Sequence, residues 1–200
     1  MKKKISCILH IIILILELIG LYSCIKSTGI EIKYYTIDSN LLALFSSILV
    51  LLYLKKQKPR IIELLWYMSV IQLTITFLVV VGILVPMTHF QWKFLLLEKT
   101  MLYYHLLCPV LSIITFLFFD EIKSFTKKES IKALSFTFGY SIIIVILNIL
   151  RVVEGPYPFL MVYKQGVIVS IFWFVLILGL AYGISIGLSQ IKNKIGKKKI

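Results

Sequence analysis

A short polar stretch with the chemistry of a nucleophile, Thr36–Asn40 (TIDSN), occurs where a long apolar segment begins. It places two hydroxyl groups, a carboxylate and a carboxamide within five positions. The Thr36 hydroxyl group can attack an ester if a base removes its proton, and a neutral imidazole suits that task at about pH 7. Asp38 or Ser39 is alternatively the cap of the helix that follows. Asn40 then opens a small, polar face that should point toward other helices.

The histidine that we predict as this base is His105, which lies four residues before Pro109. Counted at about 3.6 residues per turn, His105 lies roughly one turn inside its apolar segment. Pro109 cannot donate a helical hydrogen bond to the His105 carbonyl, so the sequence predicts a distorted helix at this point. An ionisable residue within a membrane marks either a functional site or a hydrogen-bonded position in the bundle, and both interpretations stay open here.

Glu17 is a second ionisable group inside an apolar segment. A bare carboxylate in the bilayer is costly, so Glu17 must be protonated or have a partner. His105 is a candidate partner, because a paired carboxylate would orient the imidazole and stabilise its charge. Asp38 is another candidate for that orienting role. A hydrogen bond from Glu17 to any neighbouring helix is the alternative.

A proline-rich loop, Pro156–Leu160 (PYPFL), is predicted at the same side of the membrane as Thr36 and His105. Its two prolines flank Tyr157 and make a stiff, extended turn. Tyr157 and Pro158 are therefore candidates for lining a pocket, and closing the top of the bundle is their alternative role. Tyrosines and a tryptophan near the segment ends also fit an aromatic belt at the membrane interface.

The composition places the chain in a membrane. Hydrophobic residues make up 60% of the 200 residues and charged residues 16%, and the mean hydropathy is +0.96. A soluble domain of this size could not bury so much apolar surface. The formal charge of +13 comes from short runs between apolar segments rather than from a basic stripe, which argues against nucleic-acid binding. The three cysteines show no metal-ligand spacing, so neither a metal nor another cofactor is predicted.

Each apolar segment approaches the roughly 20 residues that a membrane-spanning helix requires. We predict an all-α fold, a bundle of six transmembrane helices that forms a single domain over residues 1–200. The second apolar run, Leu41–Leu54, is short, so its helix must begin near Tyr34 or Thr36. The predicted helices cover residues 5–24, 36–54, 61–86, 101–119, 133–150 and 167–189.

The distribution of lysine and arginine predicts the orientation. Sixteen of the 22 basic residues lie at the two termini and in the second and fourth connections. Short loops rich in Lys and Arg stay in the cytoplasm, so both termini should be cytoplasmic and the plasma membrane is the expected location. The first segment also resembles a lipoprotein signal that ends at Cys24, although His10 and Glu17 interrupt its apolar run.

The last predicted helix carries Gly179, Gly183 and Gly187 at a spacing of four residues. This spacing permits close contact with another helix. The contact could form within the bundle or between two copies in a homo-oligomer, and the sequence does not separate these cases.

Three of these segments carry a resemblance to a known family. Thr36–Asn40 opening the second helix, His105 ahead of Pro109, and Tyr157–Leu160 (YPFL) occur in this order across six spans. The chain thereby resembles the Pr6Pr family of bacterial membrane proteins, which is similar to the androgen-induced (FAR/AIG-type) membrane proteins of eukaryotes. The eukaryotic branch has one more residue between its histidine and proline, and an apolar sequence where this chain has Ile37–Asn40.

The resemblance implies a threonine hydrolase that cleaves fatty acid esters of hydroxy fatty acids, with Thr36 as nucleophile and His105 as the essential histidine. With this resemblance beside the residues, a lipid-ester hydrolase near the outer membrane face is the leading hypothesis, with membrane lipids as its surroundings and a lipid-like ester as substrate. A non-enzymatic protein that binds or transports a lipid or small solute in the same pocket is the second hypothesis. A helix-bundle scaffold is the third.

Overall fold

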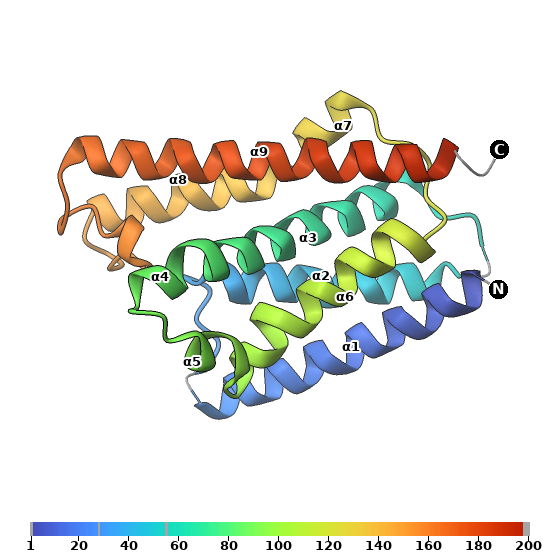
Figure 1. Ribbon diagram of the computed structural model, residues 1–200, viewed down its shortest axis with the longest axis horizontal. Helices are drawn as coiled ribbons and strands as arrows, with labels where there is room; N and C mark the ends of the chain where they lie inside the picture. Colours follow the sequence, from blue (N-terminus) through green and yellow to red (C-terminus); the bar gives the residue numbers. More distant parts are fainter. Residues whose placement is uncertain (1, 28, 55, 198–200) are drawn as a thin grey trace.

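The protein is described here by a computed structural model, which covers residues 2–27, 29–54 and 56–197. Lys55, Lys198 and Lys199, which belong to the basic clusters noted above, lie outside the described residues. Within the described part of the chain, six helices are long and apolar enough to cross a membrane. The all-helical, six-span architecture expected from the sequence is confirmed at this level. Figure 1 shows the long helices side by side, with both chain ends at the same end of the bundle.

The spans differ in regularity, since three are single helices and three are composite. The single helices are α1 (Lys2–Ser27), α2 (Tyr35–Leu52) and α9 (Val167–Lys197). The third span comprises α3 (Arg60–Val79), η1 (Val80–Leu84) and α4 (Val85–Met87). The fourth span comprises η2 (Leu102–Leu107), α6 (Cys108–Ile114) and η3 (Thr115–Phe119). The fifth comprises α7 (Lys127–Lys132) and α8 (Ser135–Ile149), while α5 (Trp92–Leu97) and η4 (Pro158–Leu160) lie in connections.

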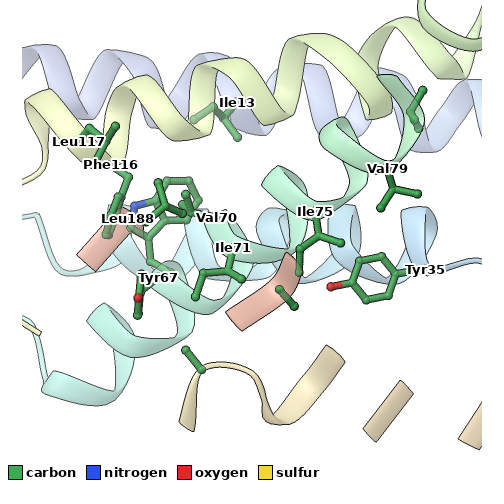
Figure 2. Close-up of a cluster of buried hydrophobic side chains, with 14 of the residues drawn as sticks. Ile13, Tyr35, Tyr67, Val70, Ile71, Ile75, Val79, Phe116, Leu117 and Leu188 are labelled. Carbon is green, nitrogen blue, oxygen red and sulfur yellow. The ribbon is translucent and has the colours of Figure 1, made fainter. Parts of the chain in front are cut away.

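Helix α3 is the centre of the bundle. It packs against α2, α6 and α9, while α1 packs against α2 and the fourth span on the other side. Figure 2 shows the core around α3, where Tyr67, Val70 and Ile71 are fully buried. The Tyr67 ring stacks on Phe125 with 4.2 Å between ring centroids. Most of α3 is buried, and its buried residues include the polar side chains of Ser69, Gln72 and Thr76 beside the apolar ones.

Three stretches have wider, π-helical turns: η1, η2 and η3. In η2 the backbone N–H of Cys108 bonds to the carbonyl of Tyr103, five residues earlier. Pro109 follows directly and has no N–H to donate, so the widened turn accommodates the missing bond to His105. The distortion that the sequence predicts at Pro109 is therefore a π-helical segment that contains His105. Such segments are frequent at functional sites.

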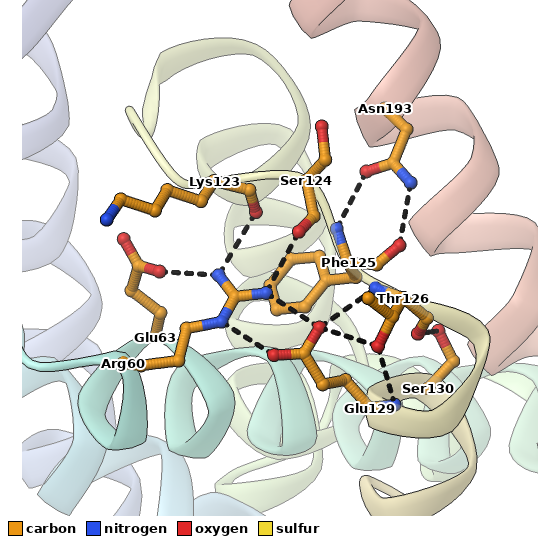
Figure 3. Close-up of polar contacts among 9 residues, drawn as sticks. All are labelled: Arg60, Glu63, Lys123, Ser124, Phe125, Thr126, Glu129, Ser130 and Asn193. Atoms are coloured by element: carbon orange, nitrogen blue, oxygen red, sulfur yellow. Dashed lines mark hydrogen bonds and ion pairs between the residues drawn. The ribbon is translucent and has the colours of Figure 1, made fainter.

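At the end of the bundle that holds both termini, Arg60 forms hydrogen bonds with several segments of the chain (Figure 3). Its guanidinium group donates to both carboxylate oxygens of Glu129, at 2.8 and 3.0 Å, and to Glu63 at 2.6 Å. It also donates to the carbonyls of Lys123 and Ser124. Arg60 thus connects the start of α3 to the segment that enters α7.

Replacement of Arg60 should test this connection. Arg60→Ala is expected to lower the free energy of unfolding by roughly 2 kcal/mol, since hydrogen bonds to charged groups contribute about 1.5–3 kcal/mol and partial exposure reduces the gain. Arg60→Lys keeps the charge but loses the planar fork, so its loss should be smaller. Thermal unfolding in detergent measures both, with Lys128→Ala as control. Equal losses in Arg60→Ala and Lys128→Ala would contradict a fastening role.

Helix α9 is mostly exposed along its first half. At Gly179, Gly183 and Gly187, an added Cβ atom would meet no described atom within 4 Å. The sequence left open whether these glycines contact another helix of the bundle or a second copy. Within the described bundle they make no such close contact. Contact with a second copy through these glycines stays a prediction.

Candidate functional site at the start of helix α2

Tyrosines from two other parts of the chain cap the N-terminus of α2. The backbone N–H of Tyr35 donates to the Tyr140 hydroxyl at 3.1 Å, and that of Thr36 donates to the Tyr157 hydroxyl at 3.3 Å. Tyr34 occupies the N-cap position without a side-chain hydrogen bond. The prediction that Asp38 or Ser39 caps this helix is therefore wrong. The hydroxyl groups of Tyr140 in α8 and Tyr157 in the proline-rich loop accept the backbone N–H bonds that a short N-cap side chain usually accepts.

Thr36 and His105 meet at this end of the bundle, although 69 positions separate them in the chain. The Thr36 Oγ1 atom lies 3.3 Å from His105 Nε2. The Tyr157 hydroxyl oxygen lies 3.4 Å from the same Oγ1 atom. A hydroxyl group, an imidazole and a phenol thus converge at one point.

The second ring nitrogen of His105 determines its tautomer. His105 Nδ1 lies 2.7 Å from the carbonyl oxygen of Leu95 in α5. A carbonyl oxygen only accepts hydrogen bonds, so Nδ1 carries the proton in the neutral ring. Nε2 then has a free lone pair directed at Thr36 Oγ1. This is the tautomer that a general base needs.

Neither carboxylate considered as an orienting group contacts His105. Glu17 is 1% exposed and lies by the thiol of Cys108, and neither of its oxygens meets a hydrogen-bond partner by distance and angle among the described residues. Asp38 lines a separate groove between α2 and α8. The candidate Glu17–His105 pair is not formed, and His105 Nδ1 is bonded to the Leu95 carbonyl instead.

The side chains of Ser39 and Asn40 both bind the backbone carbonyl of Thr36. Ser39 Oγ donates to the Thr36 carbonyl at 3.0 Å and lies 3.1 Å from Thr76 Oγ1 on α3. Asn40 Nδ2 donates to the same carbonyl at 2.7 Å and approaches the Tyr104 carbonyl at 3.4 Å. Both side chains are fully buried. They link Thr36 to α3 and to the π-helical segment that carries His105, so they position the site rather than enter it.

Thr36 lies between two cavities. The first has a volume of about 370 Å³, and its mainly apolar lining includes His105, Tyr157 and Pro158 together with Glu31 and Thr88. The second, of about 50 Å³, is a narrow apolar slot. Residues that line the slot come from α3, α8 and α9, and include Ile75, Val79, Trp173 and Ile177. Three side chains line both cavities: Thr36, Leu84 and Tyr157.

Tyr157 contributes a neutral phenol to the site. Burial raises its pKa to about 12, while hydrogen bonds with Thr36 act in the opposite direction. Its hydroxyl oxygen accepts from the Thr36 N–H, and its own proton stays available for donation. The Tyr157 ring stacks on Phe159 with 5.3 Å between centroids and 9° between planes, which fixes the hydroxyl group in place.

The π-helical segment is held against α1 at Gly20. A Cβ atom at this position would lie 2.4 Å from Cε1 of Tyr104 and 3.2 Å from Cβ of Tyr103. The Tyr104 ring is 2% exposed and cannot move aside easily. Glycine is therefore needed here for close approach of α1 to the residues that precede His105.

Gly20→Ala should accordingly disturb both stability and the site. Overpacking of this kind costs about 1–3 kcal/mol, and it would displace Tyr104 next to His105. Gly139→Ala on α8 is the matched control, because an added Cβ atom there meets nothing within 4 Å. Thermal unfolding in detergent compares the two variants. Equal stability of Gly20→Ala and Gly139→Ala would contradict the packing argument.

Sequence reasoning missed three contributors to the site: the Leu95 carbonyl, the Tyr140 hydroxyl and Thr76. A backbone carbonyl has no signature in the sequence. Tyr140 was indicated only by being a polar aromatic residue inside a long apolar segment. Thr76 similarly lies inside an apolar helix, where its hydroxyl group receives or donates a bond to Ser39.

Comparisons with protein-family models, curated proteins and solved structures find no match for this chain. The class of protein therefore follows from the structure itself. Six apolar helices, an apolar composition and a polar site near one end of the bundle define a multi-pass membrane protein.

Proposed function

We propose that this protein is a membrane hydrolase of fatty-acyl esters, with Thr36 as nucleophile and His105 as general base. The observation that carries the proposal is the 3.3 Å approach of Thr36 Oγ1 to His105 Nε2, with the opposite ring nitrogen bonded to the Leu95 carbonyl. A nucleophile, a base and a group that orients the base are the arrangement of covalent hydrolases.

The reaction follows from these contacts. His105 Nε2 takes the proton of Thr36 as Oγ1 bonds to the ester carbonyl carbon. The bond from that carbon to the alcohol oxygen then breaks, and the alcohol leaves with the proton from His105. Water, activated by His105, hydrolyses the acyl-threonine, which releases the fatty acid and restores the Thr36 hydroxyl group.

Tyr157 is proposed to stabilise the negative charge on the carbonyl oxygen. The N–H groups of Tyr35 and Thr36 already donate to phenols, so the first turn of α2 is not the free oxyanion site that its helix dipole suggests. The neutral Tyr157 hydroxyl group is close to Thr36 Oγ1 and has a proton to donate. A donor directed at developing charge in a water-poor site accelerates acyl transfer.

The two cavities suggest how an ester would bind. The larger cavity, of about 370 Å³ and mainly apolar, has room for part of an acyl ester, whereas the cavity of about 50 Å³ has room only for a short apolar group. An ester carbonyl at Thr36 would then lie at the point where the cavities meet. We further propose membership of the Pr6Pr family, both termini in the cytoplasm, and a site near the outer face of the plasma membrane, on the strength of the residue pattern and the basic clusters.

Purified protein in nanodiscs tests the proposal against a panel of branched fatty-acyl esters and a fluorophosphonate probe. Turnover and covalent labelling are expected for the wild type and not for Thr36→Ala or His105→Ala. Lipid that copurifies with an inert wild type would instead indicate a lipid-binding or transport protein. Turnover that persists in Thr36→Ala would overturn the assignment of the nucleophile.

A further inference from the structure

A cavity lined by lysines lies at the end of the bundle that holds both termini, away from the two cavities at Thr36. Its volume is about 390 Å³. The start of α1, the connection between α2 and α3, and the connection between η3 and α7 contribute its walls. Four lysines line it: Lys3, Lys56, Lys58 and Lys123.

These four lysines form no ion pair with a carboxylate among the residues that the structure describes. Elsewhere, Lys33, Arg60 and Lys164 each contact a glutamate. Two glutamates line the same cavity, but Glu63 is already bound by Arg60 at 2.6 Å. Among the described residues that line the cavity, four lysines and two glutamates give a net charge of +2.

The Asp120 carboxylate, next to the cavity-lining residues Phe119 and Glu121, already accepts hydrogen bonds from other side chains. Asp120 accepts hydrogen bonds from Ser6 Oγ at 2.6 Å and from Trp66 Nε1 at 2.6 Å, and lies 3.2 Å from His10 Nε2. Asp120 is 4% exposed. Lys58 is near enough to act on its charge, yet forms no ion pair with it in the described chain. The lysine ammonium groups are therefore left for the cavity, where Gln57 adds a neutral donor, while the Ser6 proton is used by Asp120.

We infer that this cavity binds a phosphate oxyanion, either in the headgroup of an anionic phospholipid or in a free phosphate compound. Lysine binds phosphate as a compact point charge on a flexible stem. Basic pockets between membrane helices commonly receive such headgroups. Leu54, Phe119 and Ile122 give the cavity an apolar wall that suits the glycerol and upper acyl carbons of a lipid. The inference is independent of Thr36 and its chemistry.

The test compares two triple variants of equal charge. K56Q/K58Q/K123Q removes three lysines of the cavity. K127Q/K128Q/K132Q removes three exposed lysines of α7, at the same end of the bundle but outside the cavity. Native mass spectrometry after detergent exchange measures retained phosphatidylglycerol against phosphatidylcholine. Because each lysine near an anionic surface contributes about 1 kcal/mol, retention of phosphatidylglycerol should weaken on the order of 100-fold in the cavity variant only.

A second arm distinguishes the source of the phosphate. Inorganic phosphate is added to lipid-free protein in detergent, and the midpoint of thermal unfolding is followed in all three proteins. If phosphate raises the unfolding midpoint of the wild type and the α7 variant, and neither protein prefers phosphatidylglycerol, the cavity binds phosphate and its ligand is a free phosphate compound. Equal loss of lipid in both triple variants would overturn the inference, because general surface charge would then explain binding. So would the absence of both lipid retention and a phosphate effect.

Discussion

His105→Ala is expected to lower kcat/KM for a fatty-acyl ester by about 10²–10⁴-fold, the usual contribution of a positioned general base. His105 Nε2 is the ring nitrogen within 3.3 Å of Thr36 Oγ1, so its loss leaves the hydroxyl group without that base. Steady-state hydrolysis in nanodiscs measures the effect. Asp38→Asn is the control, because Asp38 lines a different groove and should leave the rate unchanged.

Substitutions of Thr36 give the companion result. Thr36→Ala should abolish turnover, whereas Thr36→Ser keeps a hydroxyl group within reach of His105 and should retain measurable activity. Because nucleophile and base act as one unit, the double variant T36A/H105A should be no slower than T36A alone. Additive losses in the double variant would contradict a shared step, since independent sites add and coupled sites do not.

The sequence predicted the six spans well because they depend on composition and length alone. An apolar run near 20 residues must become a helix in the bilayer, whatever its neighbours are. The position of α2 followed in the same way, since Leu41–Leu54 is too short to span and the helix does begin earlier, at Tyr35. The proximity of Thr36 and His105 was foreseen only as a consequence of shared depth and of resemblance.

The sequence could not predict how the polar groups of the site are paired. Capping of α2 was expected from Asp38 or Ser39, which are adjacent in the chain, but Tyr140 and Tyr157 supply it from a distance. Glu17 was a candidate partner of His105, because a paired carboxylate would orient the imidazole, with a bond to any neighbouring helix as the alternative. The partner of His105 is instead a carbonyl, a group that every residue carries. Pairing of this kind depends on the rotation of each helix about its axis, which apolar periodicity does not specify in a membrane.

The π-helical turn is an intermediate case. Pro109 predicted a local distortion, because it removes a backbone donor at a known position. Whether the helix would kink or widen depends on what surrounds it. Close packing of Gly20 against Tyr104 favours a continuous, widened helix, since a kink would separate the two. The sequence thus placed the irregularity correctly, while its form is determined by tertiary contacts.

Tyr157→Phe should lower kcat by about 10²–10³-fold, which is the usual cost of one lost oxyanion donor. The phenylalanine ring can keep the stacking on Phe159, so the loop should stay in place. Because the bond to the carbonyl oxygen strengthens only in the transition state, KM should change little. The Tyr157 pKa of about 12 keeps the phenol protonated below that pH. The wild-type rate should therefore show no alkaline loss from Tyr157 until the pH approaches about 12.

Tyr140→Phe is the matched control for this prediction. Both phenols accept a backbone N–H from the first turn of α2, so each substitution removes one cap. The described contacts bring only the Tyr157 hydroxyl group to Thr36 Oγ1. Tyr140→Phe also removes the bond from the Tyr140 hydroxyl group to the Lys33 carbonyl, at 2.6 Å. If capping alone mattered, Tyr140→Phe would therefore lose at least as much activity as Tyr157→Phe. A loss of kcat confined to Tyr157→Phe would instead show that this phenol acts on the reacting ester.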